Sequence, residues 1–492
     1  MFRTHYLASL VLAAITASVW AGGSASTDEP KAALHTSAVP LVPSLIVKYK
    51  SASAATGAQA LSTAAQAGEG VVHAQRLASF AARHGVTVKY VRRISTGGDV
   101  FKFSHGLSNA EAFKMAREVV RENPDIEYAE PDLILHHMGI PAPGAKPNYV
   151  PNDPLFYKQW DMHEQIGGIN AINAWDITRG QDANGNSVAV AVLDTGYRPH
   201  ADLVANILPG YTFITDPVMA NNGVGRTSDA TDPGDSNGTS PSSWHGTHVS
   251  GTIAAVADNN LGISGVAPLA KVVPVRVLGV GGGATSDIVD GMVWAAGGTV
   301  TGVPANANPV KVMNMSLGSE NPCLNTFRAA VKQVNALGAS VVVAAGNSSQ
   351  NTRGAEPASC PGVIAVGATN RAGGRAAYSN YGAMVTVSAP GGEAFIGDPP
   401  DGEILSTLND GTTKPGNDIY GYDQGTSMAT PHVVGVVALM LSVNPALTPD
   451  QVRSILVSTA RQFPSTCAGC GAGIVDAQAA VLGAMNAPTS KK

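Results

Sequence analysis

Four polar residues stand at points in the sequence where they could do chemistry together. Asp194 closes the apolar run VAVLD, His245 opens HGTHVSG, Ser427 lies in GTSMATPH, and Asn347 ends VVVAAGN. A serine hydroxyl becomes a nucleophile when a histidine takes its proton and a carboxylate fixes the tautomer of that histidine. An asparagine amide can donate to the oxyanion that forms on the attacked carbonyl. The four residue types together predict acyl transfer.

Each of these residues also has an ordinary structural explanation. A serine at the start of a helix is a favoured N-cap, and Asp and Asn are common turn formers. His248 follows His245 by one helical turn and could suggest a metal pair, but we interpret it as a structural histidine. Only the joint occurrence of all four types favours catalysis.

Two other catalytic classes fail on the sequence. The run DTG at 194–196 is also an aspartic protease signature, but that mechanism needs two carboxylates, and no second D-[TS]-G occurs. An esterase of the α/β-hydrolase type would place its serine in G-x-S-x-G, ahead of the Asp and the His, whereas Ser427 comes last in GTSMA. A catalytically silent secreted binding protein on the same fold, or an esterase, remains the alternative.

The elements that must position these residues follow an α/β pattern. The runs SVAVAVLD, KVVPVRVL, KVMNMSLG, ASVVVAAGN and GVIAVGAT are almost uniformly apolar, and amphipathic stretches separate them at 246–257, 285–297 and 324–337. Such strands are typical of a parallel sheet buried on both faces, which binds ligands at the carboxyl ends of its strands. We therefore expect an α/β domain at 152–485, with a central parallel sheet flanked by helices.

A different pattern precedes this domain. Residues 44–129 show the order strand, helix, strand, strand, helix, strand, and the second helix begins with a capping box from Ser108 to Glu111. This order predicts a small α+β domain of the ferredoxin-like type. Residues 139–151 are rich in Pro and Gly and predict a linker, and 486–492 predict a short tail.

The first 25 residues have the features of a secretory signal. Arg3 precedes an apolar run from Tyr6 to Trp20, and small residues follow. We expect no later stretch to be long and apolar enough to span a membrane, so no membrane contact should remain after the signal is removed. The formal net charge of −5 provides no basic surface for nucleic acid. The sequence predicts a secreted protein.

Export affects how the four cysteines are interpreted. An even number of cysteines in an oxidising compartment favours disulfides, and we predict Cys323 with Cys360 and Cys467 with Cys470. A zinc site with four cysteines is the alternative, but Cys323 and Cys360 lack close ligand spacing.

The motifs VLDTG, HGTHVSG, AAGN and GTSMATPH, in this order, resemble the subtilisin family of secreted serine proteases, the subtilases. The order Asp, His, Ser is the one known from subtilisin itself. The resemblance covers roughly 150–485. It implies Asp194 as the orienting carboxylate, His245 as general base and acid, Ser427 as nucleophile, and Asn347 as oxyanion donor.

The region before the catalytic domain resembles the inhibitory prodomain of these enzymes. Residues 26–138 would then be a propeptide with its folded core at 44–129. The resemblance implies self-cleavage within about 130–150. Until then, the prodomain would act as an intramolecular inhibitor.

The resemblance also implies how a substrate would bind. Subtilases bind a peptide as an added strand, which depends on backbone hydrogen bonds. A phosphate-binding loop is the alternative for the glycines at 279–283, but G-x-x-x-x-G-K-[ST] is absent. We expect protein or peptide substrates and a monomeric enzyme. The residues that match the two binding edges and the wall of the first specificity pocket are Gly281, Gly282, Gly283, Ser316, Leu317, Gly318 and Gly346.

Calcium is the implied cofactor, in a structural role. Asp153, Asp202 and Asn259 fit the places of the family's calcium ligands, and hard oxygen donors suit Ca²⁺. A second site could use the run RTSDATDPGDSNG, where acidic residues recur every third position, but an ordinary polar loop explains this run equally well. Its acidic residues are Asp229, Asp232 and Asp235.

Overall fold

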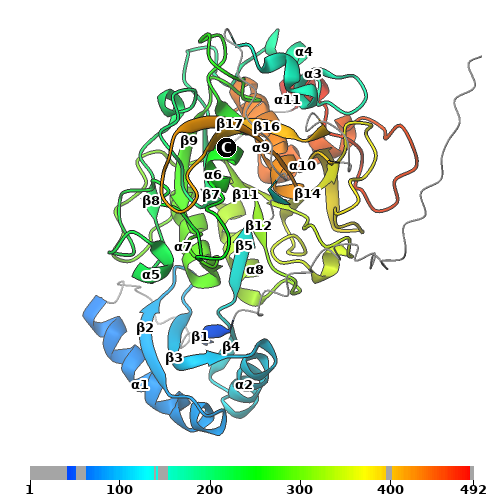
Figure 1. The fold of residues 1–492 in the computed structure, drawn as a ribbon. Coiled ribbons are helices and arrows are strands. Elements are labelled where there is room, and N and C mark those ends of the chain that lie inside the picture. The colour runs from blue at the N-terminus through cyan, green and yellow to red at the C-terminus, as the bar shows by residue number, and fades with distance from the viewer. Residues whose placement is uncertain (1–40, 51–62, 138–139, 142–152, 395–401, 488–492) are drawn as a thin grey trace, which may run out of the picture. The chain divides into compact units, whose positions relative to one another are not determined.

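The structure is a computed structural model that describes residues 41–50, 63–137, 140–141, 153–394 and 402–487 (Figure 1). The predicted signal at 1–25, most of the linker at 139–151 and the last five residues lie outside this range. All described residues belong to one compact unit, Leu41–Lys492.

The N-terminal part of this unit forms a four-stranded antiparallel sheet in the order β2-β3-β1-β4. This sheet and its two helices have the ferredoxin-like arrangement that the sequence predicts. Helix α2 begins with the predicted capping box between Ser108 and Glu111. The elements are β1 (Val42–Tyr49), α1 (Thr63–Arg83), β2 (Val88–Arg93), β3 (Asp99–Leu107), α2 (Asn109–Glu122) and β4 (Ile126–Pro131).

The central sheet has seven strands in the order β15-β14-β13-β11-β7-β9-β8. Its pairs are parallel, which confirms the predicted fold class. The five apolar runs of the sequence all contribute strands. The strands are β7 (Ala189–Asp194), β8 (Tyr211–Thr212), β9 (Lys271–Arg276), β11 (Val312–Met315), β13 (Ser340–Ala344), β14 (Val363–Thr369) and β15 (Val385–Pro390).

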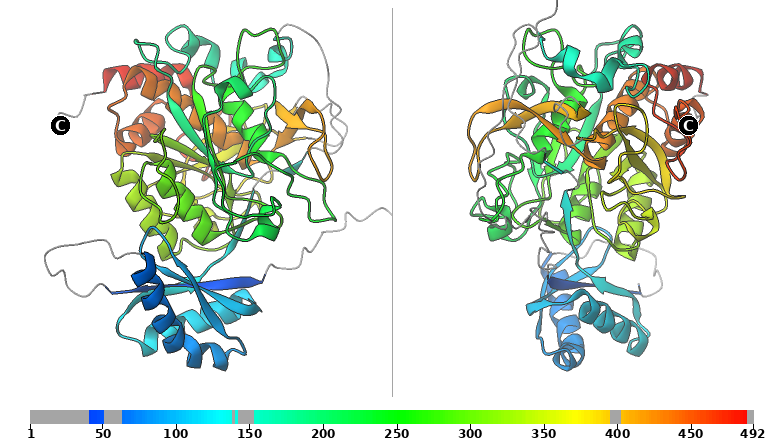
Figure 2. Two further views of the ribbon diagram at one scale, coloured as in Figure 1. Left: turned by 90° about the vertical axis from the view of Figure 1, so that its left-hand side faces the viewer. Right: turned by 45° about the vertical axis from the view of Figure 1, so that its right-hand side comes forward.

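Helices cover both faces of this sheet (Figures 1 and 2). Successive residues of β7 show why: Val190 and Val192 belong to one buried cluster with residues of α6, α9 and α11, whereas Ala191 and Leu193 belong to another with residues of α7 and α8. Side chains alternate between the faces of a strand, so a strand buried on both faces must be apolar throughout. The helices are α6 (His245–Ala254), α7 (Thr285–Ala295), α8 (Asn325–Ala336), α9 (Thr426–Val443), α10 (Pro449–Thr459) and α11 (Ala477–Asn486).

Helix α9 corrects one expectation. Thr426–Val443 is long and apolar enough to cross a membrane by length and composition, although we expected no such stretch after the signal. However, 94% of it is buried inside the protein. A helix that is apolar on all sides is typical of a protein core, and this one is the core helix of the α/β domain.

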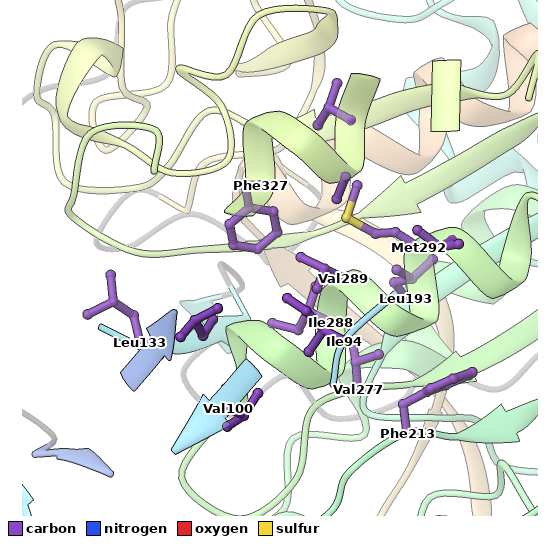
Figure 3. Packing of buried hydrophobic residues seen from close by; sticks show 14 of the residues in the cluster. Ile94, Val100, Leu133, Leu193, Phe213, Val277, Ile288, Val289, Met292 and Phe327 are labelled. Atoms are coloured by element: carbon purple, nitrogen blue, oxygen red, sulfur yellow. The ribbon is translucent and has the colours of Figure 1, made fainter. Parts of the chain in front are cut away.

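One buried cluster joins the small N-terminal sheet to the central sheet. Figure 3 shows part of it: Ile94 and Val100 from the small domain lie near Ile288 and Val289 of α7. The two domains therefore share apolar packing.

Short elements complete the fold. They are β5 (Ile134–His137), β6 (Ile140–Pro141), α3 (Trp160–His163), α4 (Ala171–Trp175), α5 (Pro217–Ala220), β10 (Gly283–Ala284), β12 (Leu317–Gly318), β16 (Ile404–Asn409) and β17 (Asp418–Gln424), with 3₁₀ turns at Phe156–Lys158, Val204–Asn206 and Thr352–Gly354.

Both predicted disulfides are present. Cys323 is bonded to Cys360 and Cys467 to Cys470, which rules out a zinc site made of four free thiolates.

Candidate active site

The fold brings the four predicted catalytic residues to the carboxyl side of the central sheet. Asp194 is the last residue of β7, and Asn347 follows β13. His245 is the first residue of α6, and Ser427 is the second residue of α9. Asp194, His245 and Ser427 are buried.

Asp194 and His245 form a buried pair. The His245 Nδ1 atom lies 2.8 Å from Asp194 Oδ1, which also accepts a hydrogen bond from the backbone N–H of Thr195. Burial alone would lower the pKa of His245, but nearby carboxylates outweigh this effect and raise it above its ordinary value, and the charge and the hydrogen bond of Asp194 contribute most to this rise. The pair therefore stabilises an imidazolium, which a general base becomes when it takes a proton.

The glycine after His245 explains how α6 comes so close to β7. A Cβ atom at Gly246 would stand 2.1 Å from the carbonyl oxygen of Gly196. The Gly246 N–H donates to Thr195 Oγ1 over 3.0 Å. Any larger residue would separate the helix from the turn after β7, and with it His245 from Asp194.

The position of Ser427 excludes the simple capping explanation. The N-cap of α9 is Gly425, which has no side chain, and Ser427 lies inside the first turn. Its Oγ donates to the carbonyl oxygen of Ser316 over 3.2 Å. A side chain at the N-terminal turn stands at the positive end of the helix dipole, where negative charge is stabilised.

The Asn347 side chain is anchored by the residue before Ser427. Asn347 Oδ1 accepts hydrogen bonds from the N–H of Thr426 over 2.9 Å and from Thr426 Oγ1 over 2.8 Å. Because the amide oxygen is engaged, the NH₂ group is the end that remains to donate to a substrate. This arrangement suits an oxyanion donor beside Ser427.

His248 is a structural residue, as we interpreted it. It is buried, and its Nε2 lies 3.0 Å from the carbonyl oxygen of Ile404 and 3.2 Å from that of Gly421. Burial lowers the pKa of His248 to about 3, so the ring is neutral at ordinary pH.

Two further carboxylates act on His245: sequence reasoning named Asp235 only as a candidate calcium ligand and did not single out Asp423. Asp235 accepts from the N–H and the Oγ of Ser243, two residues before His245, and Asp423 lies on β17, four residues before Ser427. The charge of each raises the pKa of His245. Asp423 itself is buried, and this burial raises its pKa to about 7. No local pattern predicts these effects on His245, because both residues come near it only through the tertiary fold.

The predicted peptide-binding edges receive a segment of the chain itself. Strand β5 lies between β10 and β12 in a three-stranded antiparallel sheet. Gly283 and Ala284 pair with Leu135 and Ile134, and Leu317 and Gly318 pair with His137 and His136. This is strand addition of the predicted kind.

The other residues predicted at these edges lie next to the paired residues or join neighbouring elements. Gly281 and Gly282 have φ angles of 80° and 112° and form the turn before β10. Ser316 directly precedes β12. The N–H of Gly346 donates to Thr426 Oγ1 over 3.1 Å, which ties the end of β13 to the start of α9.

The residues predicted for the first calcium site come together. Asn259 Nδ2 donates to Asp202 Oδ1 over 2.6 Å. Burial raises the pKa of Asp202 to about 7, and the nearby charge of Asp153 adds to this rise. Asp153 Oδ1 is buried without a hydrogen-bond partner among the described residues. Two carboxylates forced together, one with an unsatisfied oxygen, fit a divalent cation with hard oxygen ligands.

Two of the residues predicted for a second calcium site lie near each other: the charge of Asp235 adds to the burial that raises the pKa of Asp232 to about 6, and Asp232 Oδ2 is buried without a hydrogen-bond partner among the described residues. Among the described residues, Asp229, Asp232 and Asp235 form no cluster with all ligand atoms within 4.8 Å. Asp229 accepts from Thr231, Asp232 from the N–H of Gly234, and Asp235 from Ser243. These contacts fit a polar loop, and the second calcium site stays a prediction.

Comparisons with known proteins identify the family of the chain. Residues 185–473 match the model of the subtilase family. The chain is 46% identical over 453 residues to an extracellular protease of Xanthomonas campestris, covering 90% of this chain and 73% of the relative. It is 41% identical over 415 residues to an extracellular basic protease of Dichelobacter nodosus, covering 81% of this chain and 64% of the relative. The chain therefore spans about three quarters and two thirds of the lengths of these two relatives.

Solved structures show the same likeness. A protease from Pseudoalteromonas arctica superposes with a TM-score of 0.65 at 54% identity, covering 68% of this chain and all of that one. Fervidolysin from Fervidobacterium pennivorans, a keratinolytic enzyme related to subtilisin, superposes with a TM-score of 0.62 at 25% identity, covering 92% of this chain and 62% of that one. On its motifs, its fold and these matches, the chain belongs to the subtilase family of serine endopeptidases.

Proposed function

We propose that this protein is a secreted endopeptidase that cleaves protein substrates through an acyl-enzyme on Ser427. The Ser427 oxygen attacks the scissile carbonyl while His245 takes its proton, and Asn347 donates to the oxyanion that forms. When the C–N bond breaks, His245 returns the proton to the leaving amine. Water then repeats the sequence and releases the acid. The buried Asp194–His245 pair at 2.8 Å is the observation that carries this proposal.

Export is supported by three features. The N-terminal segment has a positive charge, an apolar run and small residues in the order of a secretory signal. Two disulfides join all four cysteines, which is usual outside the cytoplasm. The relatives from Xanthomonas and Dichelobacter are both named as extracellular proteases.

The N-terminal domain is proposed to be a propeptide that inhibits the enzyme until it is removed. The backbone pairing of β5 with β10 and β12 supports this, because a bound strand there excludes a substrate. Polar contacts hold the domain beside that strand. Glu130 accepts from the N–H groups of Asn325 and Thr326, and Asp132 accepts from the N–H and Oγ of Ser286.

These two acids stand at the starts of α8 and α7, where free N–H groups and the helix dipole favour negative charge. Arg92 adds ion pairs to Asp287 and Asp290 of α7, and Arg226 contacts the same two aspartates. The propeptide therefore contributes one of the two cations that neutralise a buried acidic pair.

We also propose that the self-cleavage of the propeptide falls between His137 and Ile140. Strand β5 pairs with the substrate edge at Leu317 and Gly318, whereas β6 pairs with Asp423 and Gln424 of β17. Both pairings lie beside residues close to Ser427: Ser316, which precedes Leu317, accepts from Ser427 Oγ, and Gln424 lies three residues before Ser427 in the sequence. The peptide bonds between the two pairings are therefore the ones proposed to reach the nucleophile. This proposal narrows the interval of about 130–150 to three peptide bonds.

A serine-directed fluorophosphonate tests the proposed function. The matured protein should lose its cleavage of a protein substrate such as casein as it takes up the reagent, and peptide mapping should find the added mass on Ser427. A protein that takes up no reagent and cleaves nothing would be an inactive binding protein. A protein that cleaves esters but no peptides would be an esterase. Either result would contradict the proposal.

Calcium is proposed to stabilise the enzyme through Asp153, Asp202 and Asn259. The ion would supply the positive charge that the two carboxylates lack. Removing it leaves like charges in a buried site, so chelation is expected to shorten the half-life of thermal inactivation about tenfold or more.

The measurement is residual activity during heating with EDTA or with added Ca²⁺. An Asp153→Asn variant is the control, since it removes one ligand charge and should show little further loss on chelation. A native half-life that does not change with chelator would exclude a stabilising calcium site here.

A further inference from the structure

The carbonyl group of Ser427 lacks the hydrogen bond that a helix would normally give it. In an α-helix, the carbonyl of one residue accepts from the N–H four residues later. The residue four positions after Ser427 is Pro431, which lies inside α9 and has no N–H. A buried carbonyl without a partner is costly, so another donor is needed.

Ser316 provides that donor from the sheet. Its Oγ donates to the carbonyl oxygen of Ser427 over 2.8 Å, and Ser427 Oγ donates back to the carbonyl oxygen of Ser316 over 3.2 Å. Asn314 Nδ2 donates to Ser316 Oγ over 2.9 Å. All three residues have an exposed fraction of 0%. Because Asn314 donates to the Ser316 oxygen, it leaves the hydroxyl hydrogen to point at Ser427.

We propose that Ser316 is a positioning residue for the nucleophile. Its hydroxyl replaces the helical hydrogen bond that Pro431 removes, and so fixes the first turn of α9 and the direction of Ser427. The inference rests on the proposed function of Ser427. It is separate from the peptide-binding role of this edge, because strand addition uses the backbone and leaves the Ser316 side chain available.

Ser316→Ala is expected to lower kcat about 10- to 100-fold and to leave KM within about threefold, since a displacement of the nucleophile by an ångström can cost about 100-fold in rate. The rate of inactivation by a small fluorophosphonate should fall by a similar factor, because this reagent does not need the substrate strand. Rates are measured per molecule of matured protein, counted by intact mass.

The control is Ser442→Ala on the same helix. Ser442 Oγ is buried and donates to the carbonyl of Leu439, far along the helix from Ser427. This variant removes an equivalent hydroxyl and should keep the native kcat.

Pro431→Ala provides a rescue that a general structural defect would not show. It restores an N–H four residues after Ser427, which can donate to the same carbonyl. In the Ser316→Ala background it should recover kcat and the phosphonylation rate several-fold, whereas in the native background it should change them little.

A native kcat in Ser316→Ala, or a loss that Pro431→Ala does not relieve, would overturn the inference. If Ser316→Ala does not fold, the double variant decides: a folded, active double variant supports the inference, and an unfolded one overturns it. Failure of the proposed function gives a different result from failure of this inference. If Ser427 were not the nucleophile, Ser427→Ala would keep its activity, whatever the effect of Ser316→Ala.

Discussion

A Ser427→Ala chain is expected to keep its propeptide and to hydrolyse protein substrates about a million times more slowly than the native chain. The corresponding loss in subtilisin is of this order. Without the hydroxyl there is no oxygen to form the acyl-enzyme, and the oxyanion donors and binding groups leave only a small residual rate. The same loss should stop the cut between His137 and Ile140, if that cut is made by the enzyme itself.

Intact mass of the exported proteins measures both effects, with the native and variant chains made in a host that lacks extracellular proteases. The native product should begin at residue 138, 139 or 140. The variant should still carry the propeptide residues that precede this cut, joined to Ile140 and the residues after it. Ser442→Ala should mature like the native chain. If native and variant chains both keep the propeptide, self-processing is wrong and an inactive binding protein becomes the better explanation.

If both chains lose the propeptide, another protease performs the cut. In that case the million-fold difference in casein hydrolysis still decides whether Ser427 is the nucleophile. A native first residue outside 138–140 would contradict the register argument from β5 and β6, but it would not affect the assignment of Ser427.

The sequence predicted the parts of this site that depend on local pattern. Asp194 ends an apolar run and therefore a buried strand, and the strand's carboxyl end is where ligands bind in parallel sheets. His245 directly precedes the stretch at 246–257 that the sequence predicted to be helical, and it is the first residue of α6. Such signals lie within a few residues of the functional group, so one sequence is enough to find them.

The parts that the sequence did not predict depend on contacts across the fold. Asp423 acts on His245 from a strand more than 170 positions away. Ser316 was predicted only as part of a backbone edge, yet its hydroxyl reaches the carbonyl of Ser427. Pro431 explains this contact, but a proline in a helix does not reveal which distant residue replaces the missing donor.

Removing the charge of Asp194 should have the second largest effect. Asp194→Asn keeps the shape of the side chain, but an amide can present its NH₂ group to His245 Nδ1 and favour the wrong tautomer. A loss of about 10⁴-fold in kcat is expected from the equivalent change in other serine proteases of this mechanism. Ser427 should still react slowly with a fluorophosphonate, because the hydroxyl and the oxyanion donors remain.

The pH dependence of this variant gives an independent check. His245 acts as a base only when it is neutral, so activity rises as the pH passes above its pKa. The effect of burial, which lowers this pKa, persists in the variant, whereas the largest effect that raises it is lost with the Asp194 charge. The acid limb of kcat/KM should therefore move to lower pH, even though the maximum rate falls.

Asp423→Asn is the matched control for this prediction. It removes a charge that also raises the pKa of His245 but that comes third, after the charge and the hydrogen bond of Asp194. Its acid limb should move in the same direction by less, and kcat should remain far above that of Asp194→Asn. If Asp194→Asn kept kcat within tenfold, or if its acid limb moved to higher pH, Asp194 would not be the group that orients His245 and raises its pKa. The combination of a large rate loss with an acid shift separates loss of the orienting carboxylate from simple damage to the fold, which lowers the rate without moving the limb.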